Sequence, residues 1–283
     1  MFTKIAIIGT GNIGTWLFKT LQTKGNLSVV SVSSRNMETL PTNLDLYIFA
    51  LKDDVYETVL QQIPFQMPHA VHTSGSLSQQ ILAPFAEKVG VVYPYQTITR
   101  EAEGRKEKGE GRKGEKEKEE KEKGEGKKEA VEISPSNFEG VPEGRGSLYI
   151  CDVPICIESS DADFEASLFQ WANSIFPIVY KINEKQRFAM HLAAVFANNF
   201  TNAMYDIAYQ IFKENNLDWS LIFPLLENTL EKAKHNNPRL VQTGPAVRCD
   251  SSIMKKHCEA LKDENLKSLY GIVSKIILKN TKH

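Results

Sequence analysis

The stretch Gly9-Thr10-Gly11-Asn12-Ile13-Gly14 follows directly on the short apolar run Lys4-Ile5-Ala6-Ile7-Ile8. The run is typical of a buried parallel strand, and the residues after the glycines carry apolar side chains at helical spacing. Strand, glycine turn and helix form the context in which a G-x-G-x-x-G pattern indicates a dinucleotide site. Gly9 would allow the tight turn, Gly11 would admit a pyrophosphate, and Gly14 would let the helix pack on the strand.

Asn12 and Ile13 stand at the start of the predicted helix. Backbone N–H groups there, together with the helix dipole, favour a bound phosphate. We therefore predict that both residues and the three glycines contact a dinucleotide. The alternative interpretation is that the glycines serve only a tight turn between strand and helix.

The end of the second predicted strand, 27–32, indicates which dinucleotide. An acidic residue at this place would accept a hydrogen bond from the ribose 2′-hydroxyl of NAD. This chain instead has Ser33, Ser34 and Arg35, and its first acid is Glu38. Two hydroxyls and a guanidinium suit a 2′-phosphate, so we predict NADP(H), with Arg35 as the main contact. The alternative is an ordinary surface arginine in a loop.

Leu51 and Lys52 follow the third predicted strand, 44–51. Because ligands of open α/β sheets collect at the carboxyl ends of the strands, we add both residues to the predicted cofactor contacts.

Length and composition exclude several classes of protein. The chain has 283 residues and a net charge of −1, which fits one large or two modest domains and gives no reason to expect a nucleic-acid partner. No apolar run reaches the length of a membrane span, and the start does not resemble a signal peptide. The four cysteines form no C-x-x-C pair, so we expect reduced thiols in a cytoplasmic protein and no metal site.

The segment from Glu101 to Ala130 consists almost entirely of Glu, Lys, Arg and Gly. It cannot bury enough apolar surface to offset chain entropy, so we predict a disordered insertion that extends over about residues 100–146.

The remaining pattern alternates strands with helices and then becomes wholly helical. We predict a doubly wound, Rossmann-type parallel sheet in a cofactor domain, residues 1–182, and an all-helical domain, residues 183–283, for substrate binding and dimerisation. The predicted strands are 4–8, 27–32, 44–51, 70–73, 90–94, 153–158 and 176–182, and the main predicted helices are 15–23, 55–62, 163–173, 184–215, 219–235, 252–261 and 264–278.

Four segments together resemble one protein family: His72–Ser76, Tyr93–Thr97, His191–Asn202 and Thr243–Asp250. The family comprises proteins regarded as NADP oxidoreductases, with a Rossmann-like N-terminal domain and a C-terminal helical domain of unknown function. Its architecture is similar to that of pyrroline-5-carboxylate reductase, ketopantoate reductase and the phosphogluconate dehydrogenase C-terminal-like group. The resemblance implies a homodimer formed through the helical domain. The charged segment after Thr99 departs from the family's pattern.

Two of these segments offer groups for chemistry. Ser74 follows a predicted strand, so its hydroxyl could hold a carboxylate or carbonyl near the nicotinamide, although it could equally cap a plain turn. In the long helix, 100° spacing places His191, Asn198 and Asn202 on one face, with Asn199 at its edge. We predict that His191 donates a proton while the asparagines orient the reactant. The alternative is a helix–helix or dimer contact tied by amide hydrogen bonds.

The fourth segment turns at Gly244-Pro245 and then carries Arg248 and Asp250. Arg248 could bind a substrate carboxylate in bidentate fashion, with Asp250 orienting it or capping the next helix. A structural pair between the two is the alternative.

Two classes of function remain. The first is an NADP-dependent oxidoreductase that transfers hydride between the nicotinamide and a small carbonyl or imine acid. The second is a non-catalytic NADP-binding sensor or scaffold protein, which would keep the glycine turn and Arg35 but would not need the polar groups of the long helix.

Overall fold

The computed structural model describes residues 1–98 and 153–281. The chain divides into two compact units, Met1–Asn198 and Asn199–His283, here called the N-terminal and C-terminal units. The predicted insertion, about residues 100–146, lies outside the described residues. Within the described parts, no helix is long and apolar enough to cross a membrane.

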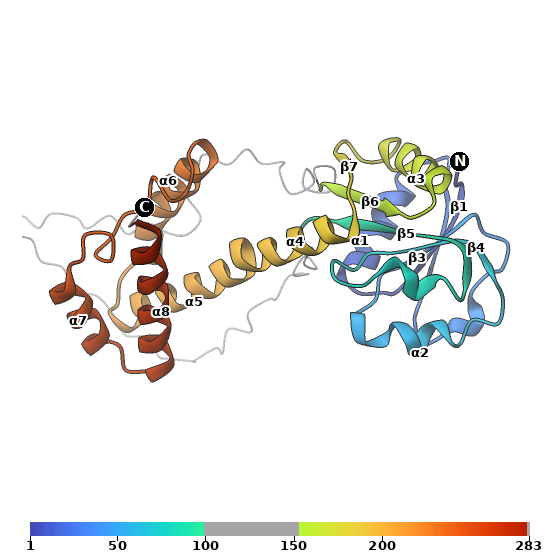
Figure 1. Ribbon diagram of the computed structural model, residues 1–283. Coiled ribbons are helices and arrows are strands. Elements are labelled where there is room, and N and C mark those ends of the chain that lie inside the picture. The colour runs from blue at the N-terminus through green and yellow to red at the C-terminus, as the bar shows by residue number, and fades with distance from the viewer. Residues whose placement is uncertain (99–152, 282–283) are drawn as a thin grey trace, which may run out of the picture. The chain divides into compact units, whose positions relative to one another are not determined.

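One seven-stranded sheet forms the centre of the N-terminal unit (Figure 1). The strand order is β2-β1-β3-β4-β5-β6-β7, and all neighbours pair in parallel except β5 and β6. The sheet confirms the predicted fold class, with β6 and β7 running opposite to the rest. The strands are β1 (Lys4–Ile8), β2 (Ser28–Val32), β3 (Leu46–Phe49), β4 (Met67–His72), β5 (Ala86–Pro94), β6 (Ile155–Ser159) and β7 (Val179–Lys181).

Helices cover both faces of this sheet. Successive residues of a strand point to opposite faces, and here both sets are apolar. In β1, Ile5 and Ile7 pack with residues of α1 (Asn12–Gln22) and α3 (Ala162–Asn173). Ala6 and Ile8 pack with residues of α2 (Tyr56–Leu60) on the other face. A sheet buried on both faces and covered by helices is the doubly wound arrangement. Short 3-10 turns occur at Met37–Thr39, Asp53–Val55 and Gln79–Leu82.

The helical part of the chain begins with α4 (Glu184–Ala194), which still belongs to the N-terminal unit. Asn183 and Gln186 cap its start reciprocally, each side chain accepting from the other residue's backbone N–H. A short π-helix, Val195–Phe200, here called the π-turn, then joins α4 to α5 (Thr201–Glu214). The predicted long helix is therefore present, but its α-helical hydrogen-bonding pattern is interrupted in the middle. The domain boundary at residue 182 stays a prediction.

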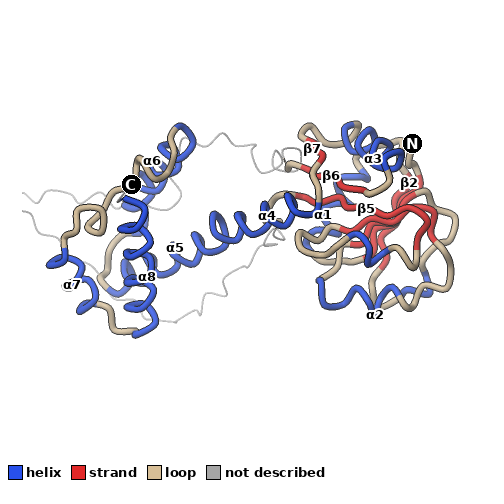
Figure 2. Tube along the Cα trace, in the orientation of Figure 1, coloured by secondary structure: helices blue, strands red, loops and turns tan. Residues whose placement is uncertain are grey.

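The described elements of the C-terminal unit are helices joined by loops, whereas strands occur in the N-terminal unit (Figure 2). After α5 come a 3-10 turn, Trp219–Ile222, and the helices α6 (Phe223–His235), α7 (Ser251–Ala260) and α8 (Glu264–Thr281). Each agrees in type with the sequence prediction and differs by only a few residues at its ends.

Candidate functional site

The glycine turn lies where the order of strands reverses. The chain leaves β1, adds β2 on one side and then returns to β3 on the other. The turn is fixed to both neighbours, because the backbone N–H of Gly9 donates to Val32 O (2.9 Å) and that of Ala50 donates to Ile8 O (2.8 Å). The crevice at such a reversal, outside the carboxyl ends of the strands, is where ligands of open α/β sheets bind.

The three glycines differ in what a side chain at their positions would meet. Gly9 has φ +118°, and a Cβ there would clash with the carbonyl oxygen of Ala50. A Cβ at Gly14 would clash with the carbonyl oxygen of Gly9, so the helix could not pack as close to the turn. At Gly11, in contrast, a Cβ would meet no atom within 4 Å. Gly9 and Gly14 are therefore required by the protein itself, whereas the space over Gly11 is open for a ligand.

The start of α1 suits an anion. Gly11 is the N-cap residue, no side chain caps the helix, and no acidic residue occupies its first turn, which Asn12 and Ile13 begin. The first N–H groups of a helix have no intrahelical acceptor. A pyrophosphate could accept from them, so the turn fits the predicted dinucleotide.

Ser33, Ser34 and Arg35 follow β2, the strand tied to the glycine turn. Ser33 Oγ accepts from the backbone N–H of Arg35 at 3.3 Å, which fixes the turn. The side chain of Arg35 is exposed, and its guanidinium has no ion-pair partner among residues 1–98 and 153–281. It is therefore free to bind a phosphate at this edge of the sheet.

Leu51 and Lys52 follow β3 at the same edge. Leu51 is half-buried, and its Cδ2 would lie 3.2 Å from a Cβ at Gly9, so its side chain packs against the glycine turn. Lys52 is exposed and precedes the 3-10 turn at Asp53–Val55. A cofactor contact by either residue stays a prediction.

A second group of polar residues follows β4. Ser74 is buried, and its Oγ accepts from the backbone N–H groups of Ser76 and Leu77, both at 3.1 Å. The hydroxyl thus caps the turn, as the simpler interpretation of the sequence expects. His72 is also buried; its Nδ1 accepts from the Ser74 N–H at 3.2 Å. Burial, reinforced by the charge of Arg187, lowers the pKa of His72 to about 4, so the ring is neutral at pH 7.

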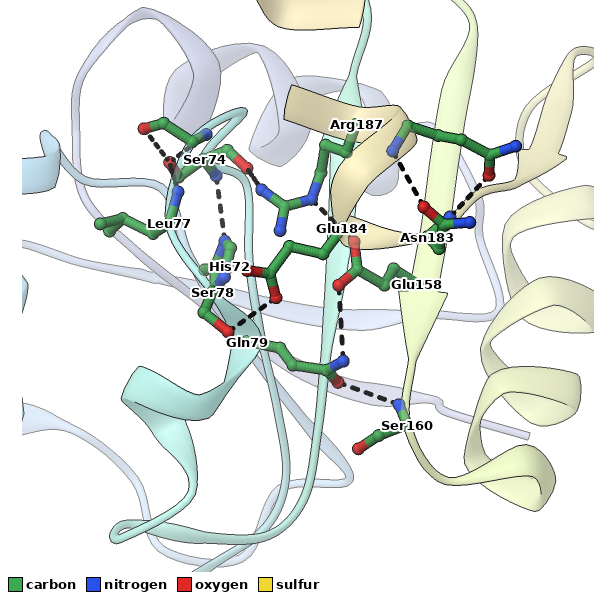
Figure 3. A network of polar contacts seen from close by, with 12 residues as sticks. His72, Ser74, Leu77, Ser78, Gln79, Glu158, Ser160, Asn183, Glu184 and Arg187 are labelled. Carbon is green, nitrogen blue, oxygen red and sulfur yellow. Dashed lines mark hydrogen bonds and ion pairs between the residues drawn. The ribbon is translucent and has the colours of Figure 1, made fainter. Parts of the chain in front are cut away.

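Arg187 of α4 ties this loop to the sheet, and sequence reasoning missed it. Its side chain is fully buried, with Nε donating to Glu158 Oε2 at 2.8 Å and Nη1 to the carbonyl oxygen of Ser74 at 2.9 Å (Figure 3). Gln79 donates to the other oxygen of Glu158 at 3.4 Å. Arg187 Nη2 and His72 Nε2 are buried without a hydrogen-bond partner among the described residues.

His191 lies one helical turn beyond Arg187, on the same face of α4. The ring is half-buried against the loop after β4, because a Cβ at Gly75 would lie only 2.6 Å from its Nδ1. The same Nδ1 is 3.2 Å from the hydroxyl oxygen of Tyr93, in β5. The structure thus brings together three of the four segments that carry the family resemblance: 72–76, 93–97 and 191–202.

The predicted polar face of the long helix assumes a constant spacing that the structure interrupts. Between His191 and Asn202 lies the π-turn, so 100° spacing does not hold across it. Asn198 is exposed and its amide donates to Thr97 Oγ1. Asn199 and Asn202 are exposed and belong to the C-terminal unit. Their part in orienting a reactant stays a prediction.

Arg248 and Asp250 also lie in the C-terminal unit. Asp250 caps α7, its Oδ1 accepting from the backbone N–H of Ile253 at 3.2 Å. Arg248 is exposed, and no ion pair joins it to Asp250 in the described part of the chain. The alternative of a structural Arg–Asp pair is therefore wrong, whereas carboxylate binding by Arg248 stays a prediction. No cluster of three metal-ligating side chains occurs among the described residues.

Comparison with protein families finds one match, in the second half of the chain. Residues 153–277 match the family model described as domain of unknown function DUF2520. The matched residues begin just before β6 and end within α8. They include α4 and the π-turn, and therefore both Arg187 and His191. No sequence among curated proteins matches the chain significantly.

Two solved structures have a similar fold. A Bacteroides fragilis protein named as a putative NADP oxidoreductase is 27% identical, with 98% of each chain covered and a TM-score of 0.75. A protein from Thermotoga maritima is 17% identical, with the same coverage and a TM-score of 0.61. A pyrroline-5-carboxylate reductase from Streptococcus pyogenes is 14% identical at a TM-score of 0.49, a likeness too weak to inform function.

Proposed function

We propose that this protein is an NADP(H)-dependent oxidoreductase that transfers hydride between the nicotinamide and a small carbonyl or imine acid. The observation that carries the proposal is the glycine turn at the strand reversal, closed at Gly9 and Gly14 and open over Gly11. Its likeness along the whole chain to the Bacteroides fragilis protein supports the same class of activity.

Residues of the N-terminal unit suit the two phosphate groups of this cofactor. The N–H groups at the start of α1 would hold the pyrophosphate, and Ser33, Ser34 and Arg35 would hold the 2′-phosphate. Bound NADP(H) would supply or accept the hydride, while the protein supplies position and electrostatics.

His191 is the proposed proton donor to the reacting oxygen or nitrogen. Its ring is held by Gly75 and Tyr93, at the end of α4 that follows the buried Arg187–Glu158 pair. A ring N–H held in this way can serve as a general acid for the reactant. A non-catalytic NADP-binding protein would not need a proton-transfer group so firmly held.

We also propose a homodimer formed through the C-terminal unit. Among its described residues only Ala246 and Ser274 are buried. Large apolar side chains on α5, α6 and α8 are exposed, which is typical of a surface that another protein covers. They include Tyr209, Ile211, Leu225, Leu230, Ile272 and Ile276. A second copy of this chain, which presents the same apolar faces, could cover them.

Titration with NADPH and NADH tests the cofactor assignment. The wild type should bind NADPH more tightly, and Arg35→Ala should reduce NADPH affinity toward that for NADH. A charge-assisted hydrogen bond contributes about 1.5–3 kcal/mol, so the loss should be roughly ten- to a hundredfold. Arg239→Ala, which removes an exposed arginine of the C-terminal unit, is the matched control and should change nothing. Equal affinity for both nucleotides would remove the NADP(H) preference, and no binding of either would remove the proposed function.

A further inference from the structure

Three residues from separate parts of the sequence surround one ring nitrogen. Gly75 lies in the loop after β4, Tyr93 in β5 and His191 in α4. The hydroxyl oxygen of Tyr93 is 3.2 Å from His191 Nδ1, and the two rings meet edge to face at 6.3 Å. Nδ1 thus lies against the loop after β4 and against β5, and Nε2 makes no hydrogen bond to the described residues.

Gly75 provides the space in which the imidazole lies. A Cβ at this position would be 2.6 Å from Nδ1, 2.7 Å from Cγ and 3.0 Å from Cβ of His191. Real Cβ atoms do not approach other atoms so closely, so any side chain at position 75 would displace the ring. The glycine is required here because the histidine packs directly on its backbone.

Arg187 fixes the helix that presents the ring. It bonds to Glu158 on β6 and to the carbonyl oxygen of Ser74, the residue next to Gly75. Since Arg187 and His191 are four residues apart on one helix, the buried ion pair sets the position of His191 over the loop. The ring is therefore held by contacts from the loop after β4, from β5 and from its own helix.

The hydroxyl of Tyr93 can act as the donor in its bond to His191 when Nδ1 carries no hydrogen. Burial raises the pKa of Tyr93 to about 12, so the phenol keeps its proton at neutral pH. Among residues 1–98 and 153–281, His191 Nδ1 is the acceptor that this hydroxyl has. A protonated Nδ1 would leave the hydrogen of the phenol without an acceptor in the described part of the chain, which costs free energy at this part-buried site.

We propose that Tyr93 and Gly75 are positioning residues for His191: Gly75 admits the ring, and Tyr93 donates to Nδ1, so that the hydrogen of the neutral imidazole is on Nε2. Nε2–H then faces the reactant as the proton donor. This proposal rests on the proposed function for its chemical purpose, although the arrangement itself belongs to the protein alone.

The hydrogen bond from Tyr93 to Nδ1 also provides a route by which His191 regains the proton that it gives to the substrate. As hydride reaches a carbonyl carbon, the Nε2–H bond of His191 breaks and the substrate O–H bond forms. The hydroxyl proton of Tyr93 moves to Nδ1, so His191 ends as a neutral imidazole and Tyr93 as a phenolate. An alkoxide is a stronger base than this phenolate, so the transfer is downhill, and water then returns a proton to Tyr93.

Nitrogen NMR of the full-length protein, labelled with ¹⁵N at histidine, tests the proposal without cofactor. Spectra are taken at about pH 8.5, where an ordinary imidazole is neutral, and His191→Gln assigns the signals. We expect Nδ1 of His191 to be unprotonated and hydrogen-bonded and Nε2 to carry the hydrogen. Tyr93→Phe keeps the ring and removes the donor, so the Nδ1 resonance should move downfield, toward that of an unbonded nitrogen.

The control is Tyr95→Phe, because Tyr95 packs on Tyr93 at 6.2 Å but makes no hydrogen bond to His191 among those described. It should leave the Nδ1 resonance unchanged, and thermal unfolding should show that both variants remain folded. A protonated Nδ1 in the wild type, or an Nδ1 resonance that does not respond to Tyr93→Phe, would overturn the proposal. NADPH titration of the same samples keeps this outcome separate from failure of the proposed function.

Discussion

The two units of this chain differ in how much of their apolar surface is buried. The N-terminal unit buries the apolar residues of its sheet on both faces, and Ile5, Ile7, Leu17 and Leu168 are fully inaccessible. In the C-terminal unit, only Ala246 and Ser274 are buried among the described residues, while Leu225 is 61% and Ile272 57% exposed. A unit with its own core can fold alone, whereas helices with exposed apolar faces gain stability by association.

The difference extends to charge. The buried ion pair and the buried neutral histidine of the N-terminal unit lie directly beside the loop that holds His191. Ion pairs of the C-terminal unit are exposed to solvent. Breaking the buried ion pair of the first unit should therefore cost more stability than breaking an exposed ion pair of the second.

The largest effect is expected at the buried ion pair. Arg187→Met leaves Glu158 buried without its partner and should lower the free energy of unfolding by about 3–5 kcal/mol. The matched substitution Lys262→Met removes the exposed partner of Glu214 and should leave stability nearly unchanged. Urea unfolding of the two variants measures both. Equal effects would contradict the contrast between the units.

His72 should give the N-terminal unit a dependence on pH. Its pKa is about 4 in the folded protein and 6.5 in the unfolded chain, so the unfolded chain binds a proton first as the pH falls. Stability should therefore be fully present above about pH 6.5 and decline toward pH 4, by up to about 3 kcal/mol.

Unfolding measured between these pH values in the wild type and in His72→Gln tests this expectation. The variant should lose most of the decline. His235→Gln, which replaces an exposed histidine of the C-terminal unit, should retain it. A decline that persists in His72→Gln would assign the effect to other groups.

The exposed face of α8 should contribute to association. Ile272→Asp places a charge where the proposed homodimer buries an isoleucine, worth about 1.5–3 kcal/mol, and should weaken self-association by at least about tenfold. Gel filtration with light scattering over a dilution series measures this. Gln170→Asp adds the same charge to an exposed position of α3 and should not change the mass. A monomeric wild type would remove the dimer from the account.

Local patterns predicted most of the fold. The apolar strands, the glycine turn and the long helical region were recognisable because periodicity and glycine placement depend on neighbouring residues. The start of β5 at Ala86 was missed, since Glu87 and Lys88 interrupt the apolar run. The reversed direction of β6 depends on pairing with β5, which no local pattern records.

The candidate site was harder to predict. Arg187 stands in the polar stretch Glu184–Arg187 and looks exposed, because its partner Glu158 is distant in the sequence. Its spacing of four residues from His191 was the available signal. The π-turn at Val195–Phe200 has no clear mark in the sequence, so a calculation at constant helical spacing does not take it into account.

The central claim is that the glycine turn binds NADP(H), and Gly11→Val tests it most directly. A Cβ at Gly11 meets no protein atom within 4 Å, so the variant should stay folded while its side chain fills the space assigned to the pyrophosphate. Gly25→Val is the matched control, because a Cβ there also meets nothing within 4 Å and lies away from the turn. Calorimetric titration with NADPH should show binding to the wild type and to Gly25→Val, and loss of binding in folded Gly11→Val. Unchanged binding in Gly11→Val would contradict the account.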